Sequence, residues 1–379
     1  MPNPIPESDF RARLSKVRQA MRRRNLQALL VYSQKRSHVT YLSGYRPNYH
    51  TNSAFVLVPL EGEPILWIKF PFDLPRARAM SWFADIRPSV SEEQEKMVAQ
   101  VAESVRSLGL GSSAIGLVGS DLAVDEISVT LSQQISTHLP NAQVTPASDL
   151  LNEIRLVKSA AEIAQVREAA RLADVVAEEL RKTIRPGMKD HDAVVRATQA
   201  ARIEGGEDCT IILSTHPSRM ALPPCGYEFQ MGHTVACEIS VNFQGYWVQV
   251  CRVLSMGRPT AAQKAIFEAT RDAHEAAVQA AKPGVPVAVL LVAAHKVIAE
   301  AGYMDYVQYG PGHGIGLDLP ELYPLDLHCT SPLAAGVIMI IHPAIWVPDQ
   351  GAAFVGGPIA VSDGEPLRLD TPQREILEA

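Results

Sequence analysis

Residues 309–321, YGPGHGIGLDLPE, are the stretch of this sequence that decides the fold. A glycine-rich run around one histidine is weak evidence when it stands alone. Here the position of this run relative to Glu238, Gln249 and His342 along the chain makes it strong evidence for the fold. Each of these three residues lies in or beside an apolar run that is typical of a buried strand. The strands are expected at 235–241, 246–254 and 337–341.

These segments resemble those of the pita-bread enzymes, the superfamily of creatinase, aminopeptidase P, prolidase and methionine aminopeptidase. The resemblance covers residues 10 to about 368. It implies an α/β N-terminal domain, residues 1–152, and an α+β pita-bread catalytic domain, residues 153–379. It also implies that strands of the second domain line a central cleft.

The same resemblance implies a metal site, because most of the superfamily holds two metal ions with four carboxylates and one histidine. In this chain Glu238 and Gln249 stand at the two Asp positions, and His313 keeps the histidine position. His342 replaces a Glu, and residues 354–358 offer no carboxylate for the last ligand. One carboxylate cannot compensate the charge of two divalent cations in a partly buried cavity. We therefore exclude a two-metal aminopeptidase.

Three hypotheses remain for this site. In the first it holds no metal, and Glu238, His313 and His342 act as acids and bases. In the second the same three residues hold a single divalent transition metal, in an enzyme of another class such as a lyase or an oxidative enzyme. In the third the protein is a non-catalytic binding module. The expected cofactor is therefore none, or one metal ion.

Further catalytic candidates surround this set. Glu238 lies on an apolar strand, where desolvation is expected to raise the pKa of its carboxyl group. Gln249 is a catalytic candidate because it stands at a metal-ligand position of the family. The resemblance places Cys251 where creatinase has a catalytic carboxylate. Cys251 is either a nucleophilic thiol or a small core residue. His216 lies in the segment where the superfamily places another catalytic histidine. Pro320 stands where peptidases have a second histidine, which weakens a peptidase hypothesis.

Substrate binding is expected to involve the segment 41–52, YLSGYRPNYHTN, which resembles the part of creatinase-like dimers that reaches into the partner's cleft. Arg46 is the candidate for a bidentate contact with a substrate carboxylate. The alternative is a surface loop. The full set of expected substrate-binding residues is Arg46, Tyr45, Tyr49, His50, Glu321 and Arg252. The resemblance implies a homodimer.

Composition and charge indicate the class of protein, its partners and its location in the cell. The chain of 379 residues is 47% hydrophobic and 20% charged, which is typical of a globular protein with two domains. A net charge of −6 without a basic stripe argues against nucleic acid as a partner. No apolar run reaches the length of a membrane span. Five cysteines without close pairs, and an N-terminus without a secretory pattern, predict the cytoplasm.

Two Pro-Gly pairs organise the second domain. Pro186-Gly187 and Pro283-Gly284, 97 residues apart, each follow one long helical pattern and precede another. Because Pro-Gly ends a helix, the repeat predicts two similar halves. In the first domain a helix and then a strand are expected within residues 9–32. Strands at 54–59, 64–68 and 114–118 and a helix at 91–109 are expected to follow.

We therefore expect a hydrolase that acts on a C–N bond in a small, carboxylate-bearing molecule. Creatinase and the ectoine hydrolases are the functional analogues that the resemblance implies, since both depart from the two-metal site. Glu238 and the two histidines are expected to activate water, or a nucleophile, and to protonate the leaving nitrogen.

Overall fold

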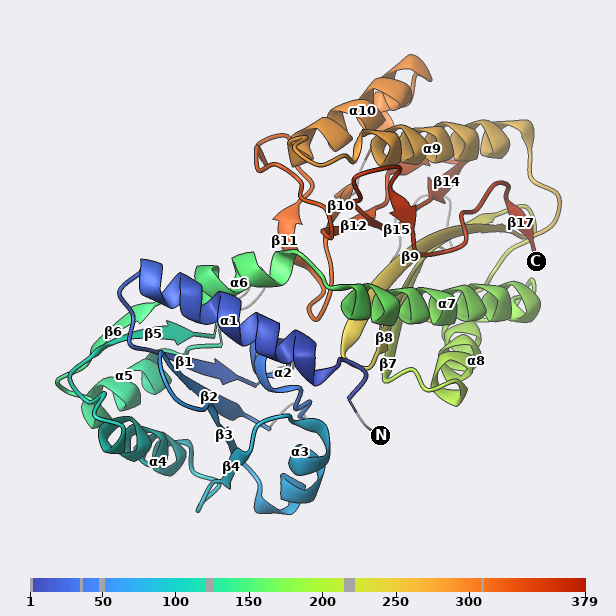
Figure 1. The fold of residues 1–379 in the computed structure, drawn as a ribbon. Helices are drawn as coiled ribbons and strands as arrows, with labels where there is room; N and C mark the ends of the chain where they lie inside the picture. Colours follow the sequence, from blue (N-terminus) through green and yellow to red (C-terminus); the bar gives the residue numbers. More distant parts are fainter. Residues whose placement is uncertain (1–2, 35–36, 48–51, 120–125, 215–221, 308–309) are drawn as a thin grey trace. The chain divides into compact units, whose positions relative to one another are not determined.

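The computed structural model describes residues 3–34, 37–47, 52–119, 126–214, 222–307 and 310–379. The chain forms two compact units, Met1–Leu156 and Val157–Ala379 (Figure 1). The expected domain boundary after residue 152 lies inside a helix of the first unit, α6 (Ser148–Leu156). As predicted, helices and strands alternate in the first unit, and the second combines helices with largely antiparallel sheets.

The first unit is a mixed sheet in the strand order β4-β3-β2-β1-β5-β6, with helices packed against it. Strands β1 and β2 pair antiparallel, whereas β1 and β5 pair parallel. The remaining bounds are α1 (Glu7–Arg23), β1 (Ala28–Ser33), α2 (Ser37–Ser43), β2 (Ala54–Pro59), β3 (Ile65–Ile68), η1 (Pro71–Asp73), α3 (Leu74–Met80), β4 (Asp85–Pro88), α4 (Gln94–Ser107), β5 (Ala114–Val118), α5 (Val129–His138) and β6 (Gln143–Pro146).

One face of this sheet packs against α4 and α5. Tyr32, Leu57 and Trp67 from the strands meet Met97 from α4 and Leu131 from α5 in one buried cluster. Apolar side chains recur on one side of each helix, as burial against a sheet requires. The expected strands at 54–59 and 114–118 coincide with β2 and β5, so these two predictions are confirmed.

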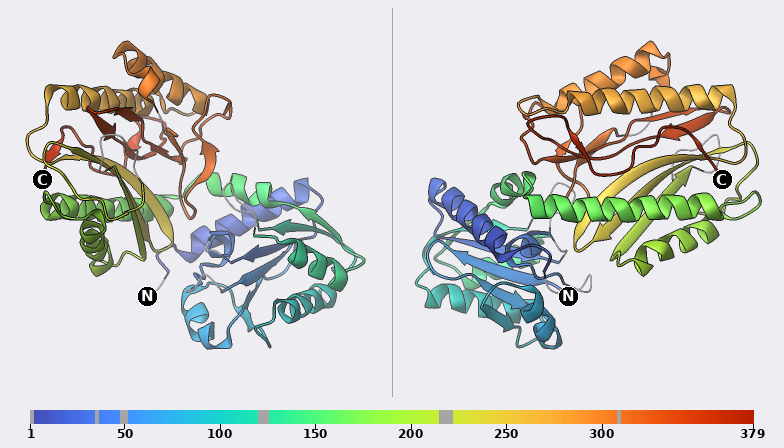
Figure 2. Two further views of the ribbon diagram at one scale, coloured as in Figure 1. Left: turned by 180° about the vertical axis from the view of Figure 1, so that it is seen from behind. Right: turned by 45° about the vertical axis from the view of Figure 1, so that its right-hand side comes forward.

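The second unit is built from two helix pairs. Its elements are α7 (Ala160–Thr183), α8 (Asp190–Ile203), β7 (Asp208–Ser214), β8 (Thr234–Phe243), β9 (Tyr246–Ser255), α9 (Ala261–Ala280), α10 (Val287–Glu300), η2 (Met304–Tyr306), β10 (Gly312–Gly314), β11 (Glu321–Pro324), β12 (Ile338–Ile341), β13 (Ala344–Val347), β14 (Gly351–Phe354), β15 (Gly357–Ala360), β16 (Leu367–Arg368) and β17 (Leu377–Glu378). Helices α7 and α8 lie on one side of the strands, and α9 and α10 lie on the other (Figures 1 and 2).

The predicted repeat is present in these helix pairs. Helix α7 ends at Thr183, before Pro186-Gly187, and α9 ends at Ala280, before Pro283-Gly284. Both helices also begin with a capping box, formed by Ser159 with Glu162 on α7 and by Thr260 with Gln263 on α9. In a capping box two side chains satisfy backbone N–H groups that the first helical turn leaves without partners.

Three sheets fill the space between the helix pairs. Their strand orders are β17-β9-β8-β7, β11-β10-β12-β15-β16 and β13-β14. The expected strands at 235–241 and 246–254 lie within β8 and β9, and the expected strand at 337–341 corresponds to β12. These strands carry the residues that the sequence singled out.

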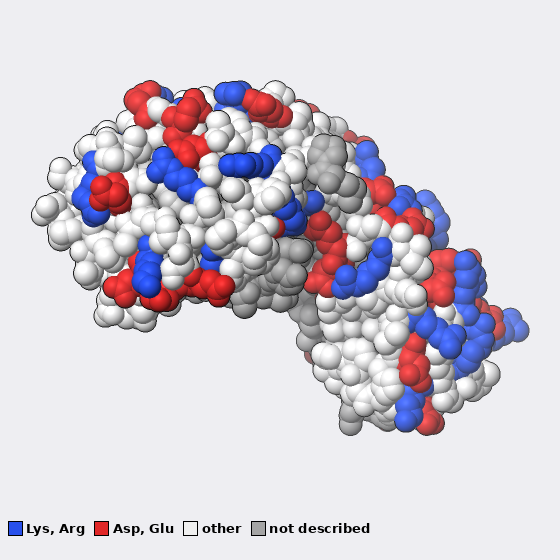
Figure 3. Space-filling model, turned by 90° about the horizontal axis from the view of Figure 1, so that it is seen from below, with Lys and Arg blue, Asp and Glu red and all other residues white. Residues whose placement is uncertain are grey.

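Charged side chains of both signs are mixed over the face drawn in Figure 3, where blue and red lie close together. Among the described residues, no helix combines the length with the apolar composition that a membrane span requires.

Candidate active site

Strands β8 and β9 place three of the expected residues on one face. Glu238 on β8 lies opposite Cys251 on β9, and Gln249 lies opposite Ser240. Opposite residues in an antiparallel pair share a face, and alternate residues along one strand share that face too. Glu238, Gln249 and Cys251 therefore point to the same side, whereas Arg252 points to the other.

The glycine-rich segment brings His313 close to this face. His313 on β10 pairs with Ile340 on β12. A Cβ at Gly312 would lie 2.0 Å from the carbonyl oxygen of Ile340, and a Cβ at Gly314 would lie 1.8 Å from that of Leu322. Neither separation is sterically allowed, so only glycine permits the close backbone approach around His313.

A chain of hydrogen bonds links three of the expected residues. Gln249 donates from Nε2 to Glu238 Oε1 at 2.5 Å, and Gln249 Oε1 lies 2.9 Å from His313 Nε2. His313 Nδ1 lies 2.8 Å from the carbonyl oxygen of Gly314. The sequence identified each of these residues, but not the role of Gln249 as the group that joins the other two.

These hydrogen bonds restrict the protonation states that Glu238 and His313 can have. Nδ1 of His313 must donate, because the Gly314 carbonyl can only accept. If Glu238 is ionised, the amide donates to it and presents its oxygen to His313, which must then be protonated at both nitrogens. If His313 is neutral, the amide takes the reverse orientation and Glu238 must be protonated. In either state Glu238 and His313 share one proton.

His342 and His313 lie with their rings at 73° and with their centroids 5.8 Å apart. Burial, followed by the neighbouring His313, lowers the pKa of His342 to about 3. Burial also lowers the pKa of His313, although hydrogen bonding to Gly314 opposes this. His342 is therefore neutral near pH 7. A role for His342 in acid–base chemistry stays a prediction.

The described residues do not fit a metal ion. In that part of the chain no three His, Cys, Asp or Glu side chains converge into a group able to hold one. Both ring nitrogens of His313 already have protein partners, and Glu238 Oε1 accepts from Gln249. A transition metal needs free nitrogen lone pairs and converging ligands. The arrangement therefore does not support the set of Glu238, His313 and His342 as ligands of a single ion.

Cys251 belongs to the core. Its side chain is fully buried in a cluster with Ala236, Ala344, Ala352 and Phe354. Burial, followed by the negative charge of Glu238, raises the pKa of its thiol well above the usual value. Since the thiolate is the nucleophile, this environment favours the core alternative.

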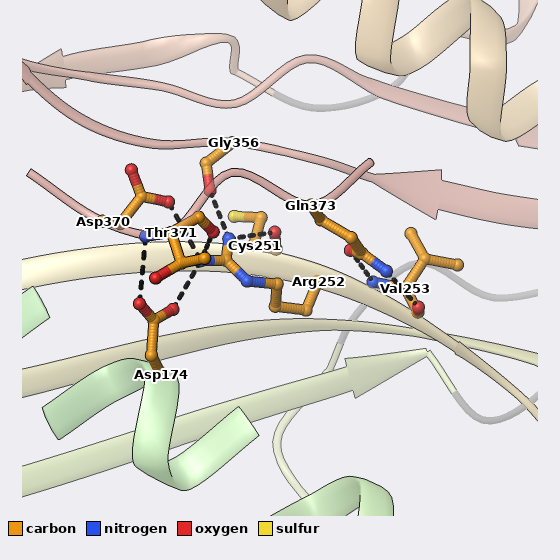
Figure 4. Close-up of polar contacts among 8 residues, drawn as sticks. All are labelled: Asp174, Cys251, Arg252, Val253, Gly356, Asp370, Thr371 and Gln373. Carbon is orange, nitrogen blue, oxygen red and sulfur yellow. Dashed lines mark hydrogen bonds and ion pairs between the residues drawn. The ribbon is translucent and has the colours of Figure 1, made fainter. Parts of the chain in front are cut away.

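Arg252 is not available to a substrate, which corrects our expectation. It is buried, and its guanidinium donates to Asp174 at 2.7 Å and to Asp370 at 2.9 Å (Figure 4). It also donates to the carbonyl oxygens of Thr371 and Gly356. Two carboxylates and these carbonyls occupy the guanidinium, so Arg252 joins β9 to the segment 370–373.

Glu321 likewise has partners within the fold, which corrects the expectation that it binds a substrate. It is buried and accepts from Lys158 Nζ at 2.7 Å. The backbone N–H of Asp318 also donates to it, at 3.3 Å. Lys158 was not among the expected site residues, because its partner is 163 residues away and only the folded chain brings them together.

The N-terminal candidates lie in the first unit. Tyr45 is buried, and its hydroxyl donates to Asp73 at 2.5 Å. Arg46 is 7% exposed, and its backbone carbonyl oxygen accepts from Arg76. The hydroxyl of Tyr45 is thus held by Asp73, and roles for Tyr45 and Arg46 at a substrate stay predictions. The other three candidates, Tyr49, His50 and His216, lie outside the described residues.

Comparison with known proteins decides the family. Residues 164–363, more than half of the chain, match Metallopeptidase family M24, and residues 13–157 match the Creatinase/Prolidase N-terminal domain. This chain belongs to family M24. The predicted pita-bread fold and the resemblance to that superfamily are thereby confirmed.

Several proteins of known sequence and structure share this M24 architecture. A protein of Bacillus subtilis named putative dipeptidase YkvY is 25% identical over 346 residues, which cover 90% of this chain and 93% of that protein. An Xaa-Pro dipeptidase of Pyrococcus horikoshii is 23% identical over 96% of this chain and 98% of its own. The crystal structure of the X-Pro aminopeptidase from Thermotoga maritima has a TM-score of 0.84, with 21% identity over 95% of this chain and all of that one.

The M24 assignment makes the protein a hydrolase of this family. The family is named for metal-dependent peptidases, yet the described residues of this member do not fit a metal ion. The solved structures, which are below 25% identity, support the fold alone. The reaction must therefore be argued from the residues of this chain.

Proposed function

We propose that this protein hydrolyses a C–N bond in a small, carboxylate-bearing molecule, without a two-metal site. The observation that carries the proposal is the hydrogen-bonded chain from Glu238 through Gln249 to His313. It stands where the family places metal ligands, and it holds a proton that a hydrolytic reaction can use.

With His313 protonated throughout, Glu238 can serve both halves of a hydrolysis by gaining a proton from water and then losing it. With Glu238 ionised, its carboxylate takes a proton from water as the water oxygen bonds to the substrate carbon. With Glu238 protonated, it gives that proton to the nitrogen as the C–N bond breaks. His313 acts as a positioning residue, because its protonated ring holds the amide of Gln249 in the orientation that donates to Glu238.

Peptide hydrolysis is the second candidate, because relatives of this chain are named dipeptidases and Xaa-Pro dipeptidase. A dipeptide is itself a small, carboxylate-bearing molecule with a C–N bond. A non-peptide substrate is favoured because the described residues form no ligand group for a metal ion that would polarise a peptide carbonyl.

The test is a substrate panel with purified protein. One arm contains dipeptides, including Xaa-Pro, and the other contains carboxylic acids that carry an amidine, urea or N-acyl group. Release of amine is measured with and without a chelator. Turnover in the second arm that resists the chelator supports the proposal, and chelator-sensitive cleavage of dipeptides alone contradicts it.

We further propose that the chain acts as a cytoplasmic homodimer, with Arg46 close to the partner's substrate. Light scattering measures the oligomeric state directly. A monomer with full activity contradicts this part of the proposal and leaves the reaction itself untouched.

A further inference from the structure

A cavity lies in the M24 unit, and its lining does not include Glu238, Gln249 or His313. It has a volume of about 230 Å³ and is lined by α9, by the turn between β14 and β15, and by residues of the segment 368–374. One water molecule takes up about 30 Å³ in the liquid. The cavity therefore has room for a small organic or inorganic ion.

Cations outnumber anions on the walls of this cavity. Its lining contains four arginines, namely Arg252, Arg271, Arg368 and Arg374, but only two carboxylates, Glu275 and Asp370. Both carboxylates are engaged, since Asp370 pairs with Arg252 and Glu275 pairs with Arg368. Two neighbouring carboxylates outside the lining, Asp174 and Asp272, pair with Arg252 and Arg271.

Arg374 differs from the other three arginines. It is exposed, and among the described residues it forms no ion pair. Its carbonyl oxygen accepts a hydrogen bond from Arg271 at 3.2 Å, which fixes the backbone of this residue beside α9. The five donors of its guanidinium are therefore available to a ligand that enters the cavity.

His274 gives a second, independent indication of a ligand. Its side chain is 6% exposed and lines the cavity from α9, and within the described part of the chain its Nε2 has no hydrogen-bond partner. Burial first, and then the charge of Arg368, lowers the pKa of this imidazole to about 3. A buried polar atom without a partner is costly, and a neutral imidazole can donate to an oxyanion.

We propose that this cavity binds a small, doubly charged oxyanion, a phosphate or a dicarboxylate, between Arg368, Arg374 and the ring of His274. Guanidinium groups suit both anions because their donors match two oxygens at once. This site does not depend on the reaction proposed above.

The cavity also shares a wall with the candidate active site. Gly356 lines the cavity and accepts from Arg252, and a Cβ at Gly356 would lie 2.6 Å from the Cα of His342. A bound anion would thus lie behind the backbone that supports His342. Occupancy is expected to change turnover without contact between the anion and the substrate.

The test is calorimetric titration of the full chain with inorganic phosphate, and separately with succinate, in a buffer free of other multivalent anions. We expect saturable binding of one equivalent. Arg374→Gln should weaken it at least about tenfold, because a charge-assisted hydrogen bond is lost. Arg258→Gln removes the same charge from an exposed position outside the cavity and should leave binding unchanged. If only one of the two anions binds, the result shows whether the site is selective for phosphate or for a dicarboxylate.

The proposal is overturned if neither anion binds saturably at millimolar concentration, or if the Arg374 and Arg258 variants weaken binding equally. His274→Asn serves as a second variant, with a thermal melt to establish that it folds. If it folds and binds both anions as tightly as the wild type, the site does not include His274 and the proposal fails.

Discussion

Gln249 shows how a single residue can redefine a site. The sequence resemblance implies only that this amide stands where the family has a carboxylate. In the fold its amide donates to Glu238 and faces His313 at the same time. A carboxylate at this position would place a second negative charge beside Glu238, whereas an amide joins the two ionisable groups.

The first prediction concerns this chain of residues. Glu238→Gln and His313→Ala should each lower turnover at least ~10²-fold, and the double variant should cost little more, because the two groups share one proton. The measurement is steady-state kinetics on the substrate found in the panel. Ser240→Ala is the matched control, since Ser240 shares the face but not the hydrogen bonds, and it should keep near-normal turnover.

Effects of the two single changes that multiply in the double variant would mean that Glu238 and His313 act independently. Gln249→Leu tests the same point, because it preserves the strand and removes the amide link. Turnover close to wild type in this variant would leave the shared proton without a function.

The second prediction concerns pH. Folding holds His342 and His274 neutral with pKa values of about 3, whereas in the unfolded chain a histidine titrates near 6.5. Below pH 6.5 the unfolded state therefore binds protons that the folded state does not. Stability should be full above pH 6.5 and fall towards pH 3, by about 1.4 kcal/mol per pH unit for each histidine.

Denaturant unfolding between pH 7 and pH 4 measures this slope. His342→Gln and His274→Gln should each make the dependence shallower, by about one proton per molecule. An unchanged slope in both variants would show that the two imidazoles are already protonated in the folded protein.

At the scale of elements, the predictable parts were those with strong local patterns. The Pro-Gly stops marked the ends of α7 and α9, and the apolar runs marked β2, β5, β8 and β9. The strands of two or three residues, β10, β16 and β17, were not predicted. Pairing with distant strands, rather than the periodicity of their own residues, makes them strands.

The third prediction uses the repeated capping boxes. Ser159→Ala and Thr260→Ala should each destabilise the protein by about 1 kcal/mol, because each removes an acceptor for a backbone N–H of the first turn. The two sites lie on different helices, so their effects should add. Urea unfolding of the two single variants and the double variant provides the measurement, and a strongly non-additive result would show that the helix starts are coupled.

The fourth prediction concerns the ion pair that joins β11 to the residue pair before α7. Lys158→Met should cost about 3–5 kcal/mol, because it leaves the carboxylate of Glu321 buried without its cation. Adding Glu321→Leu should recover much of that loss. Chemical denaturation compares the three proteins, and an effect of Lys158→Met below about 1 kcal/mol would mean that water reaches Glu321.

For the whole molecule, the sequence predicted two units and the residues around the site. It did not predict which of these residues are bound by other side chains of the fold. Arg252 and Glu321 were expected at the substrate and are instead occupied by Asp174, Asp370 and Lys158. These partners are 78 to 163 residues away in the chain. No local pattern carries such information, because either charge could equally face solvent or a ligand.

The fifth prediction concerns metal in the whole protein. Elemental analysis after purification without a chelator should give at most about one equivalent of divalent metal per chain, since one carboxylate cannot compensate two ions. Chelator treatment should leave the melting temperature unchanged. Two equivalents that leave together, with a loss of stability, would show that ligands outside the described residues complete a metal centre.

The Arg252 network has a consequence for the order in which the chain folds. Asp174 precedes Arg252 by 78 residues and Asp370 follows it by 118, so its charge is compensated only after a long stretch of the second unit has been synthesised. The sheet of the first unit is complete by residue 146. We therefore expect folding during synthesis in two steps, an early one for residues 1–156 and a slow one that waits for residue 370.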